Sequence, residues 1–86
     1  MTEKLVEIRL EKGLEARPVA VLVQKASMFD SRVYLRADGK RVNAKSIMGM
    51  MSLGLDAGSE VTVETDGEDE NEAAECLEKY LTGQES

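Results

Sequence analysis

The first predicted element is a strand, because apolar and charged residues alternate near the start of the chain, at Val6, Glu7, Ile8, Arg9 and Leu10. A period of two residues is typical of a β-strand that buries one face. We therefore expect a strand that runs to Leu10, after which Gly13 breaks the pattern.

The spacing of apolar residues changes to three and four around Pro18, which favours a helix with one apolar stripe. The stripe consists of Val19, Leu22, Val23, Ala26 and Phe29. Proline is tolerated in the first turn of a helix because the amide hydrogen that it lacks has no partner there. The pattern predicts a helix that has Pro18 in its first turn and runs to about Met28.

Two strands and a short helix are expected next. Residues 33–37 and 40–44 flank Asp38-Gly39, a dipeptide that supports the positive φ angles of a two-residue hairpin turn. These residues predict an antiparallel pair. Residues 46–53 then have the pattern of a short helix, with Ser46 as its N-cap and Gly54 at its end.

The last predicted elements are a strand over residues 60–65 and a closing helix after Asp69. Valines alternate with polar residues in the strand. Asp69 and Glu72 have the spacing of a capping box. The apolar stripe of the helix consists of Ala73, Cys76, Leu77, Tyr80 and Leu81.

The order βαββαβα predicts an α+β fold, in which one face of a sheet packs on helices and the other meets water. We expect a single domain over residues 1–86. A domain of this size buries a modest share of its surface, so a deep active-site cleft would compete with the core. We therefore expect a protein that works through its surface.

Composition argues against several classes of function. The chain has no histidine, and so lacks the usual general base near neutral pH and the commonest metal ligand. Cys76 is the one cysteine, so we expect neither an internal disulfide nor a thiolate metal cluster. Acidic residues outnumber basic ones by 17 to 11, which argues against binding nucleic-acid phosphates. A charged start and the lack of a long apolar run favour a cytoplasmic protein, and no cofactor is expected.

Residues 46–55 are the most unusual stretch, because three of the five methionines lie within four residues. On a helix, one arc would hold Ile47, Met48, Met51 and Leu55. Met50 and Leu53 would form a second arc, so that apolar side chains cover roughly 220°. We expect the core to take Met50 and Leu53 and to leave part of the first arc exposed as a partner site. The alternative is that loops or a neighbouring helix cover it.

Ser46 is the second informative position. A serine at a helix start is most often only a cap, which stabilises a helix by about 1 kcal/mol. Phosphorylation would add about −1.5 to −2 charges at a helix start, where amide groups stabilise an anion, and beside an apolar patch. The preceding Lys45 either helps to hold such a phosphate or is an ordinary surface lysine.

Two motifs resemble the HPr phosphocarrier family of the bacterial sugar phosphotransferase system. They are Gly13-Leu14-Glu15-Ala16-Arg17-Pro18 and Val42-Asn43-Ala44-Lys45-Ser46-Ile47-Met48-Gly49-Met50-Met51-Ser52-Leu53. Both stand at matching spacing, and the likeness spans essentially the whole chain. The resemblance implies an open-faced β-sandwich, with a four-stranded antiparallel sheet and three helices on one face.

One departure changes what the resemblance implies about function. Family members carry a transferable phosphate on a histidine, and Glu15 occupies that position here. A carboxylate lacks the imidazole nitrogen that accepts and releases the phosphoryl group, so we expect the histidine phosphorelay to be lost. The regulatory serine motif is kept at Ser46, as in the catabolite-repression branch of the family, the Crh proteins, which commonly have glutamine in place of Glu15.

The resemblance to that branch also implies partners. HPr kinase/phosphorylase would phosphorylate Ser46 with ATP or pyrophosphate, and the product would bind the transcription factor CcpA as a corepressor in carbon catabolite repression. Phospho-Ser46 would pair with basic groups of CcpA, and Arg17 would contact acidic ones. The apolar pockets of CcpA would take Ile47, Met48 and Met51. Alternatively, Arg17 only pairs with Glu15 or holds the phosphate locally, and such an exposed pair contributes little.

Two other functions stay open. In a degenerate phosphocarrier, Glu15 itself would form an acyl phosphate, because carboxylates can form covalent phospho-intermediates. The small acidic composition also fits an acyl carrier with a modified serine. Lys45 and Ile47 replace the usual neighbours of that serine, however, and the strand-rich pattern contradicts an all-helical carrier.

Overall fold

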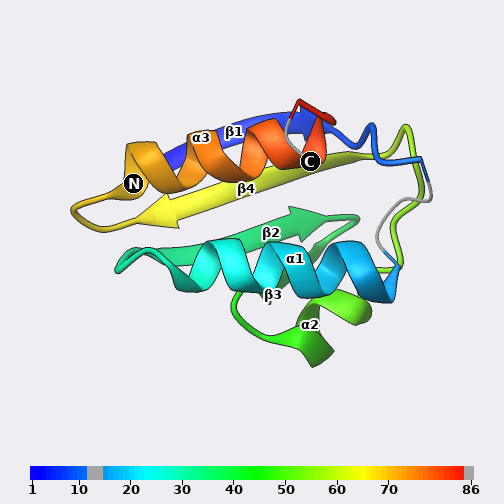
Figure 1. The fold of residues 1–86 in the computed structure, drawn as a ribbon, viewed down its shortest axis with the longest axis horizontal. Coiled ribbons are helices and arrows are strands. Elements are labelled where there is room, and N and C mark those ends of the chain that lie inside the picture. The colour runs from blue at the N-terminus through cyan, green and yellow to red at the C-terminus, as the bar shows by residue number, and fades with distance from the viewer. Residues whose placement is uncertain (12–14, 85–86) are drawn as a thin grey trace.

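The four predicted strands form one antiparallel sheet in which the first strand pairs with the last, in the order β1-β4-β2-β3. The computed structural model describes residues 1–11 and 15–84. Its elements are β1 (Thr2–Glu7), α1 (Ala16–Ser27), β2 (Arg32–Ala37), β3 (Lys40–Asn43), α2 (Ile47–Met51), β4 (Glu60–Asp66) and α3 (Glu70–Leu81), as Figure 1 shows. The predicted order βαββαβα is therefore confirmed, whereas the predicted break at Gly13 lies outside the described residues.

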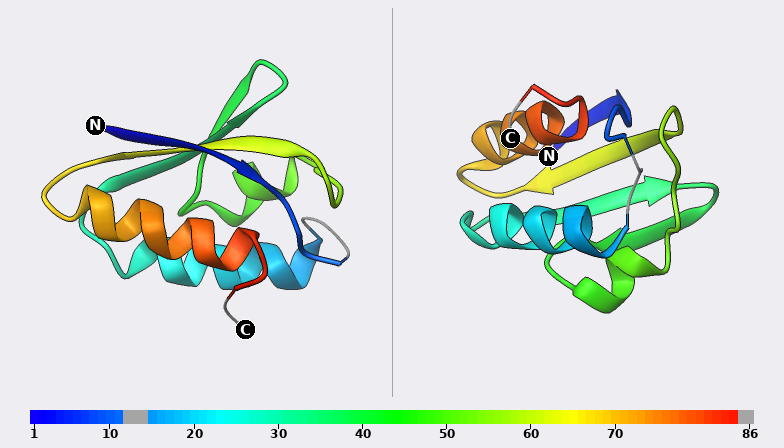
Figure 2. Two further views of the ribbon diagram at one scale, coloured as in Figure 1. Left: turned by 90° about the horizontal axis from the view of Figure 1, so that it is seen from above. Right: turned by 45° about the vertical axis from the view of Figure 1, so that its right-hand side comes forward.

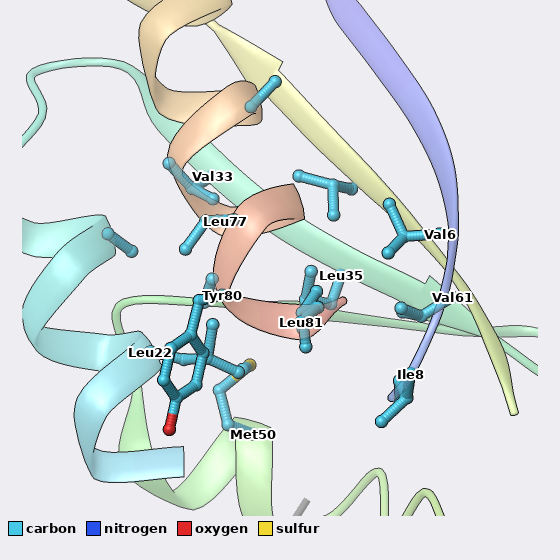
Figure 3. Close-up of a cluster of buried hydrophobic side chains, with 14 of the residues drawn as sticks. Val6, Ile8, Leu22, Val33, Leu35, Met50, Val61, Leu77, Tyr80 and Leu81 are labelled. Carbon is cyan, nitrogen blue, oxygen red and sulfur yellow. The ribbon is translucent and has the colours of Figure 1, made fainter. Parts of the chain in front are cut away.

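The alternation of side chains along the strands gives the sheet an apolar face and a polar face. Helices α1 and α3 lie side by side over the apolar face (Figure 2). Val33, Leu35 and Val63 point into the core from the two central strands and are almost fully buried. Leu22 of α1, Leu77 of α3 and Met50 of α2 meet them from the helical layer (Figure 3). All three helices thus contribute to one core on one face of the sheet, as the resemblance implied.

The opposite face of the sheet carries an ion-pair network around one buried carboxylate. Glu64 of β4 is only 4% exposed. Its two oxygens lie 3.1 Å from an Arg36 nitrogen and 3.2 Å from Nε of Arg41. The Arg41 guanidinium also stacks 3.8 Å from the ring centre of Tyr34. The exposed Leu5 of β1 lies on the same face.

The first helix and the hairpin follow the sequence pattern closely. Pro18 lies in the first turn of α1, and the helix ends at Ser27 with Met28 as its C-cap. At the hairpin, Asp38 and Gly39 have φ angles of 51° and 77°, as the two-residue turn requires. These predictions are confirmed.

Strand β1 is shorter than predicted, because it ends at Glu7 rather than Leu10. Ile8 nevertheless points into the core and is fully buried. Its backbone bonds to the loop before β4, donating to Ser59 O at 2.8 Å and accepting from Gly58 N at 2.7 Å. The alternating pattern therefore marks the buried residues correctly but runs past the end of the ladder between β1 and β4.

The predicted capping box at the start of α3 is wrong. Asp69 occupies the N-cap position, but its side chain makes no capping hydrogen bond to the helix. Its carboxylate instead accepts hydrogen bonds from Asp30 and Ser31 in the loop before β2. A tertiary contact has taken the place of the local one that the spacing indicated.

Candidate functional site

Ser46 begins helix α2, as the sequence predicts. Its backbone is extended, with φ −113° and ψ 116°, and its Oγ accepts a hydrogen bond from the amide of Gly49 at 3.2 Å. This is the geometry of an N-cap. The residue is half-buried, so its hydroxyl stands at the boundary between the protein and solvent.

The turn between β3 and Ser46 is stabilised by Asn43, a residue that the sequence analysis did not single out. The Asn43 side chain accepts from the amide of Lys45 at 2.8 Å, and the Asn43 carbonyl accepts from the amide of Ser46 at 3.0 Å. Asparagine commonly bonds to the backbone two residues further on. An asparagine between a strand and a serine N-cap is the signal that would have indicated this turn.

Helix α2 has one buried side and one exposed side. Met50 is fully buried and packs in the core, and Leu53 is half-buried against it. On the other side, Ile47, Met48 and Met51 are 54%, 85% and 46% exposed. We call these three residues the α2 patch. The prediction that the core takes Met50 and Leu53 is confirmed, and the alternative that neighbouring segments cover the patch is wrong.

Helix α2 ends earlier than predicted, and this changes the position of Leu55. The helix stops at Met51 with Ser52 as its C-cap, whereas the prediction extended it to Leu53 with Gly54 at its end. Gly54 has a φ of 55° in the loop beyond. Leu55 is buried and belongs to the core, not to the exposed arc. A helical projection fails for Leu55 because the chain has already left the helix.

Lys45 places its charge at the end of α1. Its Nζ donates to the carbonyl oxygen of Phe29 at 2.8 Å, just beyond the C-cap of that helix. A cation is favourable there because the carbonyl ends of a helix carry partial negative charge. The side chain also ties the segment before Ser46 to the end of α1.

Glu15 and Arg17 lie at the start of α1 and are both exposed. Glu15 is the N-cap residue but makes no side-chain capping bond. Both residues line a hollow of about 350 Å³, together with Leu10, Glu11 and Pro18. No ion pair joins Glu15 to Arg17, although the structure describes both residues. Gly13 and Leu14 of the same motif lie outside the described residues.

The two predicted sites lie on neighbouring helices, because α2 packs against α1. Figure 1 and the right-hand view of Figure 2 show α2 beside the first half of α1, and the two helices are in contact. The surface near the start of α1 and the α2 patch therefore belong to the same end of the helical layer.

Within residues 1–11 and 15–84, no cluster of three acidic or cysteine side chains is arranged to hold a metal ion. No helix in the same part of the chain is both long and apolar enough to cross a membrane.

The chain matches known proteins over almost its whole length. The family model described as "PTS HPr component phosphorylation site" matches residues 2–83. The HPr-like protein Crh of Bacillus subtilis is 56% identical over 81 residues, which cover 94% of this chain and 95% of that protein. The HPr-like protein Crh of Halalkalibacterium halodurans is 52% identical over 81 residues, or 94% of this chain and 96% of its own.

A solved structure shows the same fold. The phosphocarrier protein HPr from Bacillus anthracis superposes with a TM-score of 0.91 at 48% identity, over 93% of this chain and 95% of that one. A family model that matches residues 2–83, together with relatives at 52% and 56% identity, shows that this chain belongs to the HPr family of the phosphotransferase system.

Proposed function

We propose that this protein is a regulatory phosphoprotein of carbon catabolite repression that acts in the cytoplasm and has no catalysis of its own. HPr kinase/phosphorylase phosphorylates Ser46, and the phosphorylated form binds CcpA as a corepressor. The similarity to two HPr-like Crh proteins supports this class of function. The observation that carries the proposal is the Ser46 hydroxyl at the start of α2, next to the exposed α2 patch.

Phosphorylation changes the chemistry of this surface in one step. The kinase transfers a phosphoryl group to Ser46 Oγ, and the hydroxyl proton leaves. The new group adds about −1.5 to −2 charges and three strong acceptor oxygens. It stands one residue from Ile47, so a single partner meets an anion and an apolar surface together. A partner that needs both discriminates strongly between the two forms of the protein.

Each side chain of the site has a proposed role in binding CcpA. Phospho-Ser46 pairs with basic groups, while Ile47, Met48 and Met51 enter apolar pockets. Methionine suits such contacts because its flexible thioether repacks against different surfaces. Arg17, exposed at the start of α1, pairs with acidic groups. Lys45 contributes by holding the segment before Ser46 against Phe29 O.

Glu15 accounts for the loss of the relay function. It stands where the family carries its phosphorylated histidine, and the chain contains no other histidine. The carboxylate is exposed beside Arg17, so it adds a fixed negative charge to the surface that faces the partner. This charge changes the affinity for CcpA, because it repels acidic groups of the partner and attracts basic ones.

The phosphorylation step is tested with purified HPr kinase/phosphorylase and ATP. We expect the intact mass of the wild-type protein to rise by one phosphate. Ser46→Ala removes the acceptor but also the helix cap, so Ser46→Asn serves as the matched variant, because asparagine caps as well as serine. Neither variant should gain phosphate. No incorporation into the wild type, or full incorporation into Ser46→Asn, would contradict the proposed site.

The interaction is tested by titrating CcpA with Ser46-phosphorylated protein. Met48→Asp places a charge in the α2 patch and should weaken binding by about tenfold or more. Leu5→Asp is the control, because Leu5 is 66% exposed but lies on the polar face of the sheet. It should bind like the wild type. Equal affinities of wild type and Met48→Asp would contradict the apolar contact.

The second candidate is a degenerate phosphocarrier in which Glu15 forms an acyl phosphate. Its support is the position of Glu15 in the family motif and its exposure beside the hollow at the start of α1. The two candidates differ in their phosphoryl donor. Phosphoenolpyruvate with enzyme I should leave the protein unlabelled, and a hydroxylamine-sensitive label that is lost in Glu15→Gln would establish the carrier instead.

A further inference from the structure

We propose that Met48 and Met51 form an oxidation site, and that conversion of their thioethers to sulfoxides by a peroxide switches off docking at the α2 patch. The oxidation itself depends only on the structure, whereas its effect on docking rests on the proposed function. The site is separate from the phosphorylation of Ser46, since it acts on sulfur and not on the hydroxyl.

The observation behind this proposal is the contrast among three methionines of one short helix. Met48 is 85% exposed and Met51 46% exposed, whereas Met50 between them is fully buried. The susceptibility of sulfur to oxidants in water follows its exposure. Met48 and Met51 should therefore react readily, and Met50 should be protected by the core. The helix contains its own internal control.

The chemical step is a two-electron oxidation of sulfur. One oxygen atom of hydrogen peroxide is transferred to the thioether, forming an S=O bond, while the O–O bond breaks. The other oxygen leaves as water and carries both peroxide protons. Sulfur is oxidised and peroxide is reduced. No metal or cofactor is needed, and methionine sulfoxide reductases reverse the change.

The product changes the α2 patch from apolar to polar. A sulfoxide oxygen is a strong acceptor and stays hydrated, so inserting it into an apolar pocket leaves it without a hydrogen-bond partner. Ile47 would remain as the only unmodified apolar member of the patch. Ser46 would still accept phosphate, because the hydroxyl is not altered. Oxidation would thus uncouple phosphorylation from binding.

Other oxidisable side chains lie outside the patch and must be separated from it. Met28 at the C-cap of α1 is 72% exposed, and Met1 is 68% exposed. Cys76 on α3 is half-buried. All three remain in the double variant Met48→Leu/Met51→Leu, which keeps the patch apolar but removes its sulfur. This variant separates oxidation of the patch from oxidation elsewhere.

The first arm of the experiment measures oxidation rates. The protein is exposed to dilute hydrogen peroxide, quenched at intervals, and digested for mass spectrometry. We expect the oxidation rate of Met48 to exceed that of Met50 by about tenfold or more. The rate of Met51 should lie between the two or close to that of Met48. Comparable rates at Met48 and Met50 would overturn the oxidation site, because they would mean that exposure does not control the reaction.

The second arm measures binding of the Ser46-phosphorylated protein to CcpA before and after peroxide. The wild type should weaken by about tenfold or more, and methionine sulfoxide reductase should restore it. The double leucine variant, compared with its own untreated sample, should not change. Unaltered wild-type binding, or equal loss in the double variant, would overturn the switch. If the untreated phosphorylated protein did not bind CcpA, both the proposed function and the switch would be contradicted. The oxidation rates from the first arm would still test the oxidation site by themselves.

Discussion

Asp69 and Ser31 are joined by hydrogen bonds that tie the start of α3 to the loop before β2. The Ser31 hydroxyl and the Ser31 amide both donate to Oδ1 of Asp69, the amide at 2.9 Å, and the Asp30 amide donates to Oδ2 at 2.9 Å. Ser31 is 1% exposed. The contact crosses 38 residues of sequence and holds α3 in place over the sheet that carries the hairpin.

Removal of the Ser31 hydroxyl should therefore destabilise the fold. A buried hydrogen bond to a charged acceptor contributes about 2 kcal/mol, so Ser31→Ala should lower the free energy of unfolding by about that amount. Urea unfolding measures it. Ser27→Ala at the exposed end of α1 is the control and should stay within about 0.5 kcal/mol of the wild type. An equal effect of the two substitutions would contradict the structural role of the contact.

Acid should destabilise the fold, because two carboxylates at the start of α3 have lowered pKa values. The hydrogen bond from the Thr2 hydroxyl, with help from the Met1 amino group, lowers the pKa of the Glu70 carboxyl from 4.5 to about 2. The Ser31 hydroxyl likewise lowers the pKa of Asp69. A lowered folded-state pKa adds stability that is complete above the unfolded value and is lost as pH falls through the folded one.

The urea concentration at the unfolding midpoint should thus decrease as the pH is lowered from about 4.5 to about 2, which are the ordinary and the folded-state pKa of Glu70. Glu70→Gln should make this fall less steep, because it removes one carboxylate that the folded state keeps ionised. Glu68→Gln, at an exposed neighbouring position, should leave the slope as it is. If the Glu70→Gln and wild-type curves stayed parallel across this range, the assigned cause would be wrong.

Gly67 is required by a close approach to Ser31 rather than by its φ angle alone. A Cβ at Gly67 would lie 2.6 Å from Ser31 Oγ and 2.7 Å from Ser31 Cα, whereas one at Gly39 would meet nothing within 4 Å. Both glycines have positive φ angles. Gly39→Ala should cost about 1 kcal/mol from backbone strain, and Gly67→Ala about 3 kcal/mol because it also overpacks. Thermal unfolding of the two variants compares them directly, and equal losses would rule out the clash.

The sequence pattern predicted the elements well because their signals are local. The alternation around Val61, the turn at Asp38-Gly39 and the stripe of α1 each depend on residues within one element. Asp69 is a residue whose partner has no local signal. Its spacing to Glu72 indicates a capping box, but its actual partner is Ser31, which no local pattern relates to it. A side chain that satisfies a distant loop cannot be distinguished from a cap by spacing.

The candidate site was likewise predictable where its signals are local, and not where they depend on tertiary contacts. Ser46 and the exposed side of α2 follow from a cap residue and helical spacing. The end of α2 at Met51 was not predicted, because the apolar spacing of Ile47, Met51 and Leu55 continues the helical pattern although Leu55 is buried in the core beyond the helix. The bond from Lys45 to Phe29 O joins two elements, so it also has no local signal.

The ion pair between Glu64 of β4 and Arg41 of β3 should couple two strands that are separated by β2 on the polar face. Glu64 is buried while Arg41 is about half exposed, so solvent screens part of the attraction. A double-mutant cycle with Glu64→Gln and Arg41→Met should give a coupling energy of about 1 kcal/mol. Chemical denaturation of the four proteins supplies the values. A coupling near zero would show that the pair does not contribute to stability.

Neighbouring methionines on α2 should differ sharply in what they contribute to stability. Met50 is fully buried, so Met50→Ala leaves a cavity and should cost about 3 kcal/mol in the free energy of unfolding. Met48 is 85% exposed, and Met48→Ala should change stability by no more than about 0.5 kcal/mol. The comparison is matched, because both substitutions exchange the same residue types within one helix and alter its propensity equally. Urea unfolding followed by circular dichroism measures both. Similar losses would mean that Met48 packs against the protein in solution, and the α2 patch would then not be free to receive a partner.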